Sequence, residues 1–225
     1  RSDGTDGTPD HGALYPEYCV GPAKIQPLIV AALADGQAGN APWINAAKVE
    51  AGLLWFIYVS TYKEGYSCKG AAKDCDSCWA YYGAGETEET TTGFAKYTQT
   101  LEPGTHARMF KSILAVRCWR DLDNGETAMN DELHQQALGQ LDRSLDRALA
   151  VILISRLNTF RSAEGDAKAA AWAFLKVLGP VLDRAARAAD AAVADTLLAA
   201  WDSEDGSDVD AAALVQGINT ALPCP

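Results

Sequence analysis

The six cysteines are the residues of this chain whose type and spacing most directly suggest chemistry. They are Cys19, Cys68, Cys75, Cys78, Cys118 and Cys224. An even number of cysteines, with one near each end of the chain, is typical of disulfides in an oxidising compartment. We therefore expect up to three disulfide bridges. The central spacing favours Cys68 with Cys75 or Cys78, and leaves the other pairings open.

Metal-site and redox patterns are incomplete. Cys75 and Cys78 have the C-x-x-C spacing of a zinc half-site or a redox pair, but no second C-x-x-C or H-x-x-x-H completes it. The chain contains no C-x-x-C-H, which excludes covalently attached c-type haem. The acidic turns 121–126 and 202–208 lack the glycine that a calcium-binding EF-hand loop needs at its sixth position. We interpret them as helix ends and N-caps.

One histidine lies beside several arginines. His106 stands near the start of an expected helix, and Arg108, Arg117 and Arg120 follow on that helix. Guanidinium groups bind carboxylates through paired hydrogen bonds, so these arginines could hold a carboxylate or a propionate. The alternative is that they pair with the protein's own surplus carboxylates. There is no G-x-S-x-G and no glycine-rich phosphate loop, which argues against hydrolase and nucleotide-binding functions.

The overall charge restricts the kinds of partner. A formal net charge of -11 argues against nucleic acid and against an anionic membrane surface, and leaves a cationic partner or a metal open. The expected partner is a small ligand or a protein. No apolar run approaches the roughly 20 residues of a transmembrane helix. Residues 1–20 are expected to be a polar linker of the kind left after removal of a targeting segment, so we expect an exported protein, whether periplasmic, cell-surface or secreted.

Helical apolar spacing predicts an all-α protein, a helical bundle stapled by disulfides. Thr- and Glu-rich residues 85–103 are expected to be a long surface loop. On the longest helix, Asp142, Arg143, Asp146 and Arg147 are expected on the solvated face. The expected helices span 22–34, 42–62, a short segment ending near 83, 105–122, 128–160, 167–178, 180–201 and 209–222.

Residues 21–225 are expected to form a single domain. The pattern of 79–82, beginning with Trp79, returns at 172–175, and each is followed by a helix that ends in Trp and an acidic turn. This echo suggests two packed, related halves, 21–125 and 126–225. The alternative is that tryptophans and small residues simply fill gaps between Ala-rich helices.

The segment 74–83 resembles the imelysin-like superfamily of exported helical proteins. It retains Asp76, Tyr81 and Gly83 of a branch's pattern and keeps aromatic residues at Trp79 and Tyr82. A later helix is similar through Phe110 and Arg117. This resemblance implies two related helical halves and an association with iron or haem uptake. Asp74 and Ser77 replace the branch's His and Glu, and 104–109 keeps the G-x-H of a second family motif without its Glu, so the implied metal site does not carry over.

Together these features predict an exported, non-catalytic binding protein whose ligand is iron or haem. The alternative is a structural or surface-assembly protein that acts through protein–protein contacts, including self-association. The expected ligand-binding residues are Trp79, Tyr81, Tyr82, His106, Arg108, Arg117 and Arg120.

Overall fold

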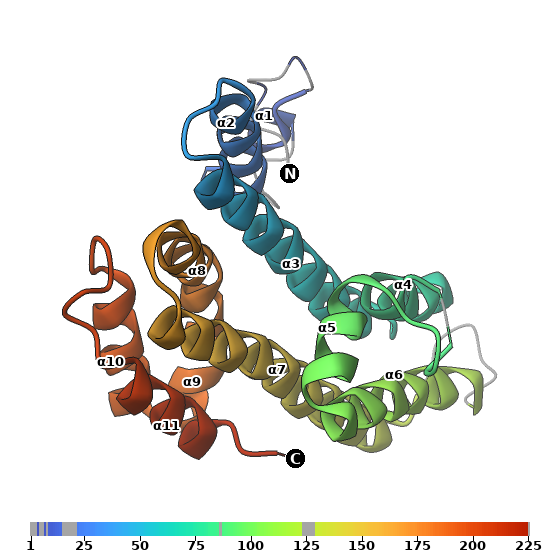
Figure 1. The fold of residues 1–225 in the computed structure, drawn as a ribbon. Coiled ribbons are helices and arrows are strands. Elements are labelled where there is room, and N and C mark those ends of the chain that lie inside the picture. The colour runs from blue at the N-terminus through green and yellow to red at the C-terminus, as the bar shows by residue number, and fades with distance from the viewer. Residues whose placement is uncertain are drawn as a thin grey trace.

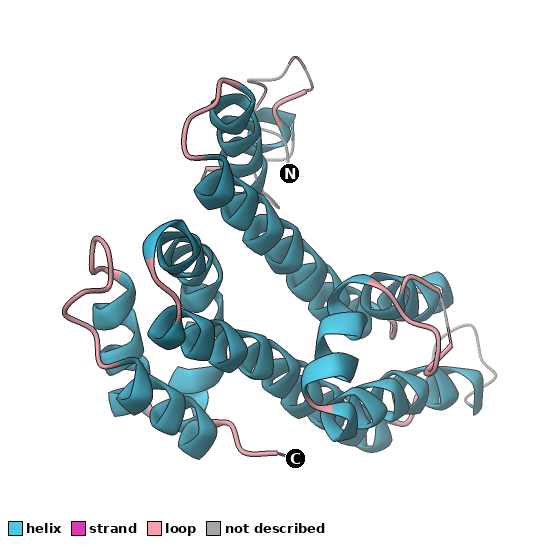
Figure 2. Cartoon of the chain, in the orientation of Figure 1, coloured by secondary structure: helices cyan, strands magenta, loops and turns pink. Residues whose placement is uncertain are grey.

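The computed structural model describes residues 9–14, 22–85, 87–122 and 129–224, together with Gly4 and Gly7. Helices and their connections make up this part of the chain, which contains no strand, and the predicted all-α class is confirmed (Figure 2). The helices are α1 (His11–Leu14), α2 (Ile25–Gln37), α3 (Pro42–Ser67), α4 (Ala72–Gly83), α5 (Gly93–Leu101), α6 (Pro103–Leu122), α7 (Asp131–Ser162), α8 (Gly165–Leu178), the 3-10 helix η1 (Gly179–Leu182), α9 (Asp183–Ala189), α10 (Ala191–Trp201) and α11 (Ala211–Ala221).

The long helix α7 is the centre of the fold. It begins at Asn130, whose side chain accepts a hydrogen bond from the Leu133 backbone N–H at 3.1 Å. In its middle, Leu145, Leu149 and Leu153 are fully buried. The helix packs against α3, α5, α6, α8 and α11 (Figure 1). Because these neighbours come from both of the predicted halves, the two parts of the chain share one hydrophobic core.

Two further predictions concern the N-terminal linker and the relation between the halves. Much of the predicted linker 1–20 lies outside the described residues, and the part that is described includes the short helix α1. The relation between halves 21–125 and 126–225 stays a prediction.

Among the described residues no helix is long and apolar enough to cross a membrane, as the sequence indicated.

The expected solvated face of α7 is wrong for two residues. Asp146 and Arg147 are each only 7% exposed. Asp146 accepts hydrogen bonds from the Tyr58 hydroxyl at 2.6 Å and from Arg184 at 3.1 Å. A helix with neighbours on several sides has no wide solvated face, so its charged side chains must be paired inside the protein.

The expected loop 85–103 is also wrong, because α5 lies within it. Phe94, Ala95 and Thr98 of α5 are fully buried. The Thr98 hydroxyl donates to the Phe94 carbonyl at 3.1 Å, which satisfies the polar group without water. The buried face of α5 contains one phenylalanine and a threonine whose hydroxyl is bonded within the helix. Such a face has the composition of a loop, so the sequence pattern did not predict this helix.

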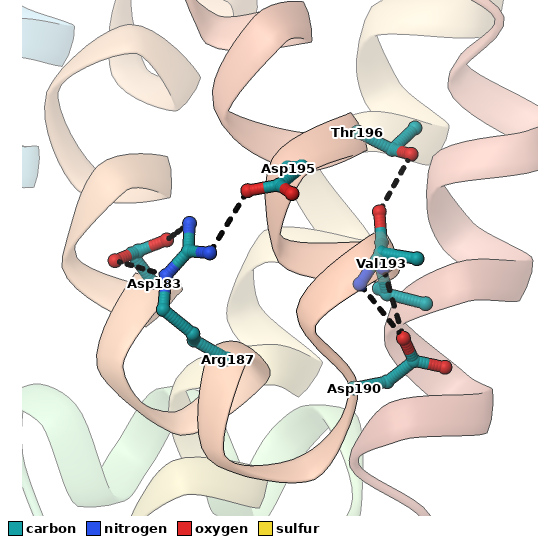
Figure 3. Close-up of polar contacts among 7 residues, drawn as sticks. Asp183, Arg187, Asp190, Val193, Asp195 and Thr196 are labelled. Atoms are coloured by element: carbon teal, nitrogen blue, oxygen red, sulfur yellow. Dashed lines mark hydrogen bonds and ion pairs between the residues drawn. The ribbon is translucent and has the colours of Figure 1, made fainter.

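The predicted helix 180–201 is interrupted at Asp190. The Asp190 side chain accepts hydrogen bonds from the backbone N–H groups of Ala192 and Val193 and so caps the start of α10 (Figure 3). Across the break, Arg187 pairs with Asp183 at 2.9 Å and with Asp195 at 2.8 Å (Figure 3). An aspartate inside an Ala-rich run therefore begins a new helix here.

A partly buried ion pair fastens α5, α6 and α11 to α7. Arg147 of α7 donates to both carboxylate oxygens of Glu102, at 2.7 and 3.0 Å. Its remaining donor bonds reach Asn219 and the Leu222 carbonyl, both at 2.9 Å. Glu102 stands between α5 and α6, so this one guanidinium fixes where α6 begins on the central helix.

The turn between α10 and α11 packs on the core through Gly206. Its φ of 74° is in the left-handed region, and a Cβ there would lie 2.7 Å from the Trp172 ring and 2.8 Å from the Phe160 ring. Trp172 Nε1 also donates to the Ser203 carbonyl at 3.3 Å. Only glycine fits both the backbone angle and the space.

Gly206→Ala should lower the free energy of unfolding by more than Gly39→Ala does. Gly39 has a comparable φ of 85°, but a methyl group there would meet no atom within 4 Å, so its substitution introduces the backbone strain alone. We expect an additional loss of about 1–3 kcal/mol at Gly206 from overlap with the rings. Urea denaturation followed by circular dichroism checks this, and equal losses would contradict the close packing of the turn.

Glu102→Gln should lower the free energy of unfolding at pH 7 by about 2 kcal/mol. This is less than the loss expected when a fully buried ion-pair partner is removed, because Glu102 is 29% exposed. The Arg147 hydrogen bonds lower the pKa of Glu102 in the folded state. The stabilisation by Glu102 is therefore present above the ordinary glutamate pKa and is lost as pH falls through the lowered value.

The difference in the free energy of unfolding between wild type and Glu102→Gln should accordingly close as the pH falls below about 4. Denaturation midpoints between pH 7 and pH 3 measure this gap. Glu164→Gln, at an exposed glutamate outside the ion pairs of the described residues, is the control and should show little change. A gap that stays constant with pH would mean that the ion pair is not its origin.

Candidate functional site

Two of the sequence-predicted residues, Tyr82 and His106, meet in the core. The Tyr82 hydroxyl lies 3.0 Å from His106 Nδ1, and His106 Nε2 lies 2.9 Å from the Glu88 carbonyl oxygen. A carbonyl can only accept, so Nε2 carries the proton and Nδ1 accepts from Tyr82. Burial raises the pKa of Tyr82, which keeps its hydroxyl a donor. Both side chains are 2% exposed or less, and the pair joins α4 to α6.

Trp79 and Arg117 also come together, at the outer side of α4 and α6. The Trp79 ring packs edge-on against Phe110 with centroids 4.6 Å apart. The Arg117 guanidinium lies over the indole, 5.0 Å from its centre, and pairs with Asp76 at 2.9 Å. Arg117 thus pairs with a carboxylate of the protein, the alternative that the sequence left open.

The remaining predicted residues lie apart. Tyr81 is 36% exposed and contacts Phe56 edge-on. Arg120 is half-buried near the end of α6, and Arg108 near its start donates to Cys224 Sγ at 2.9 Å. The seven predicted side chains are therefore a core pair, a cation–π stack and three separate residues.

The arrangement around His106 does not fit an iron or haem ligand. Both ring nitrogens are engaged, with Tyr82 and with the Glu88 carbonyl, and the ring is buried. Within the described part of the chain, no three His, Cys, Asp or Glu side chains are grouped so as to hold a metal ion. His106 and Tyr82 therefore serve here as a hydrogen-bonded pair in the core.

The cysteines form one bridge in the described residues. Cys68 and Cys75 are joined, which ties the end of α3 to α4. Cys78 is a buried thiol whose pKa burial raises to about 12, and Cys118 and Cys224 are exposed thiols. Cys224 Sγ accepts a hydrogen bond from Arg108 at 2.9 Å. Expected bridging of Cys78, Cys118 and Cys224 is thus not observed, and Cys19 lies outside the described residues.

A small basic pocket lies between α6 and α7. Its lining residues are Arg108, Lys111, Ser112, Gln140, Arg143 and Ser144, and its volume is about 280 Å³. Every charged side chain that lines it is basic, in a chain of net charge -11. The ion pairs of the described residues do not include Arg108, Lys111 or Arg143. Three cations converge here without a carboxylate bound to them.

Two buried hydroxyl groups lie at this pocket. Ser112 donates to the Arg108 carbonyl at 2.8 Å, so in its 3.1 Å contact with Ser144 it must accept. Ser144 is consequently the donor of the pair. Its hydrogen is bonded only to a neutral hydroxyl and can turn toward an anion, where a hydrogen bond is stronger.

A larger cavity beside Trp172 is less suited to an anion. Its volume is about 760 Å³, and Lys48, Lys168 and Lys176 line it, but so do Glu204 and Asp205. Lys176 already donates to the Ser203 carbonyl at 2.8 Å, and Lys168 lies over the Phe160 ring. Cations at this cavity are balanced by acids and engaged with the protein itself.

Buried carboxylates on α7 provide the other titratable cluster. Burial raises the pKa of Asp146 and of Asp142, although hydrogen bonds from Tyr58 and Tyr66 act in the opposite direction. The Tyr66 hydroxyl donates to Asp142 at 2.5 Å, and Arg184 lies over the ring of Tyr62. These contacts join α3 and α9 to α7, so the role of this cluster is to hold the three helices together.

The sequence predicted one residue of the basic pocket, Arg108, as an anion-binding group. It missed Lys111 and Arg143, and it missed the two serines. Lys111 lies one turn after Arg108, so α6 carries a basic edge, whereas α7 contributes the single cation Arg143. To predict that these side chains converge on one pocket, one must know that α6 and α7 are antiparallel neighbours.

In comparisons with protein-family models, with curated proteins and with solved structures, nothing matched this chain. The relation to imelysin-like proteins therefore stays a prediction, and the functional argument depends on the geometry of the chain itself.

Proposed function

We propose that this is a non-catalytic binding protein whose ligand is a small anion held between α6 and α7. The observation that carries the proposal is the convergence of Arg108, Lys111 and Arg143 on one pocket without carboxylate partners. Elsewhere on α6, α7 and α9, arginines such as Arg117, Arg147 and Arg184 have acidic partners. A carboxylate or phosphate in this pocket would form direct ion pairs with these cations.

The physical chemistry favours a ligand of modest affinity. Arg108, Lys111 and Arg143 are exposed, so each contact is screened by water and salt. The Ser144 hydroxyl is buried and adds a directional hydrogen bond. With two or three charge-assisted contacts, the dissociation constant for a small carboxylate should be on the order of 1 mM.

Haem belongs to the proposed ligand class because its propionates are carboxylates on an apolar ring. The expectation of an iron or haem ligand therefore becomes a further test of the same pocket. Haemin binding that weakens in Arg143→Ala would support haem as the ligand. Export is likewise a proposal, supported by the buried Cys68–Cys75 disulfide, which an oxidising compartment maintains.

Arg143→Ala should weaken binding of butyrate by about fivefold, or about 1 kcal/mol, because one of three converging cations is removed. Isothermal titration calorimetry at low salt measures this, and added NaCl should weaken wild-type binding further. Arg161→Ala is the control, since Arg161 is an exposed arginine near the other end of α7 that donates to Asn158. If Arg143→Ala binds butyrate as tightly as wild type, the pocket is not the site.

A second candidate function is self-association as part of a structural or surface assembly. Helices α2 and α3 form a hairpin (Figure 1). Large apolar side chains are exposed on it, among them Leu33, Trp43, Leu53 and Phe56. Trp43 is 68% exposed, and Leu53 and Phe56 lie one turn apart on the same face of α3. Contact with the same hairpin of a second copy would remove these side chains from water.

If the hairpin mediates self-association, the mass measured by light scattering should rise with protein concentration, and Leu53→Glu should abolish the rise. Because Leu53 is 50% exposed, the substitution should leave the fold intact. Leu101→Glu, at an exposed leucine on α5, provides the comparison and should retain association. A constant monomer mass over the concentration range would eliminate this candidate.

A further inference from the structure

We infer that the ligand is a single-chain anionic amphiphile, a long-chain carboxylate, whose hydrocarbon chain follows the groove between α6 and α7. This inference depends on the proposed function, because the carboxylate occupies the basic pocket described above. It adds the chemical class of the rest of the ligand and the direction in which the ligand lies.

A second cavity continues the basic pocket along the same two helices. Its volume is about 400 Å³, and Gln140 lines both cavities. The residues that line this continuation are Ala115, Cys118, Trp119, Asn130, Leu133, Gln136, Ala137 and Gln140. None of these side chains is charged at neutral pH in its ordinary state, so the groove changes from basic to uncharged and mostly apolar at Gln140.

Helical spacing explains why the two cavities form one groove. On α6 the lining positions from Arg108 to Trp119 recur at three- and four-residue intervals, which places them on one face. On antiparallel α7 the matching positions run from Ser144 back to Leu133. Eleven helical steps correspond to about 16 Å, enough for a carboxylate followed by an extended hydrocarbon chain.

Small side chains and one fixed aromatic ring shape the apolar end. Ala115 and Ala137 contribute little volume where the helices face each other. The Trp119 ring is held in place, because its Nε1 donates to the Asn130 carbonyl at 2.7 Å and its face stacks on His134 with centroids 4.0 Å apart. Leu133 at the rim is 51% exposed, an apolar surface that a hydrocarbon chain would cover.

Charge complementarity selects this occupant and its direction. A wholly apolar ligand would leave Arg108, Lys111 and Arg143 without a bound carboxylate, and a simple anion would leave Leu133 exposed to water. A long-chain carboxylate satisfies both ends, with its head at Arg143 and its chain toward Trp119. The apolar chain adds affinity in proportion to the methylene groups that leave water.

The test compares dodecanoate with butyrate, two carboxylates that differ only in chain length, by calorimetry below the concentration at which dodecanoate forms micelles. Wild type should bind dodecanoate at least tenfold more tightly. Leu133→Asp places a charge at the apolar end and should remove this preference. Leu114→Asp is the matched control, since Leu114 is an exposed leucine of α6 that does not line the groove, and it should keep the preference.

Two outcomes would overturn the inference without touching the proposed function. Equal affinities for dodecanoate and butyrate, both weakened by Arg143→Ala, would mean that the pocket binds anions but not chains. Identical effects of Leu133→Asp and Leu114→Asp would place the chain elsewhere. Failure of wild type to bind butyrate would instead refute the proposed anion site, and this inference with it.

Discussion

The pairing of charges in the buried middle of α7 is the constraint on which the rest of the structure depends. Asp146 and Arg147 are adjacent in sequence, and both are removed from water. Desolvation of either charge would be costly without a partner, so neighbouring helices must supply Tyr58, Arg184 and Glu102 at fixed positions. Hydrophobic burial brings these helices onto α7, and the polar contacts determine where along α7 each one lies.

The groove follows from this arrangement. Because Glu102 is bound to Arg147 immediately before α6 begins, α6 runs antiparallel to α7 from a fixed starting point. That register brings Ser112 against Ser144 and places basic side chains of both helices around one pocket. Arg117 and Arg147, in contrast, are paired with Asp76 and Glu102. The cations left for a ligand are those on the edge of the α6–α7 pair that the described helices leave exposed.

The sequence predicted the helical class, and several boundaries agree closely with the structure because local rules set them: Pro42 begins α3 and Gly83 ends α4. It could not predict α5, whose buried face depends on tertiary contacts around Phe94 and Thr98. It also failed for Asp146 and Arg147, since burial of a charge depends on partners distant in sequence. Arg108 was anticipated from its residue type, whereas Lys111 and Arg143 acquire a shared role only when α6 and α7 are placed side by side. The role of His106 also depends on tertiary contacts. Tyr82 and the Glu88 carbonyl occupy both of its ring nitrogens, which its position in the sequence does not reveal.

The most direct measurement for the central claim is a titration of isotope-labelled protein with dodecanoate, followed by nuclear magnetic resonance of backbone amides and arginine side chains. The account predicts shifts that begin at Arg143, Ser144 and Lys111 and extend along α6 and α7 to Trp119, with little change at Trp172. Shifts centred on the larger cavity beside Trp172, or no saturable shifts at the basic pocket, would contradict it.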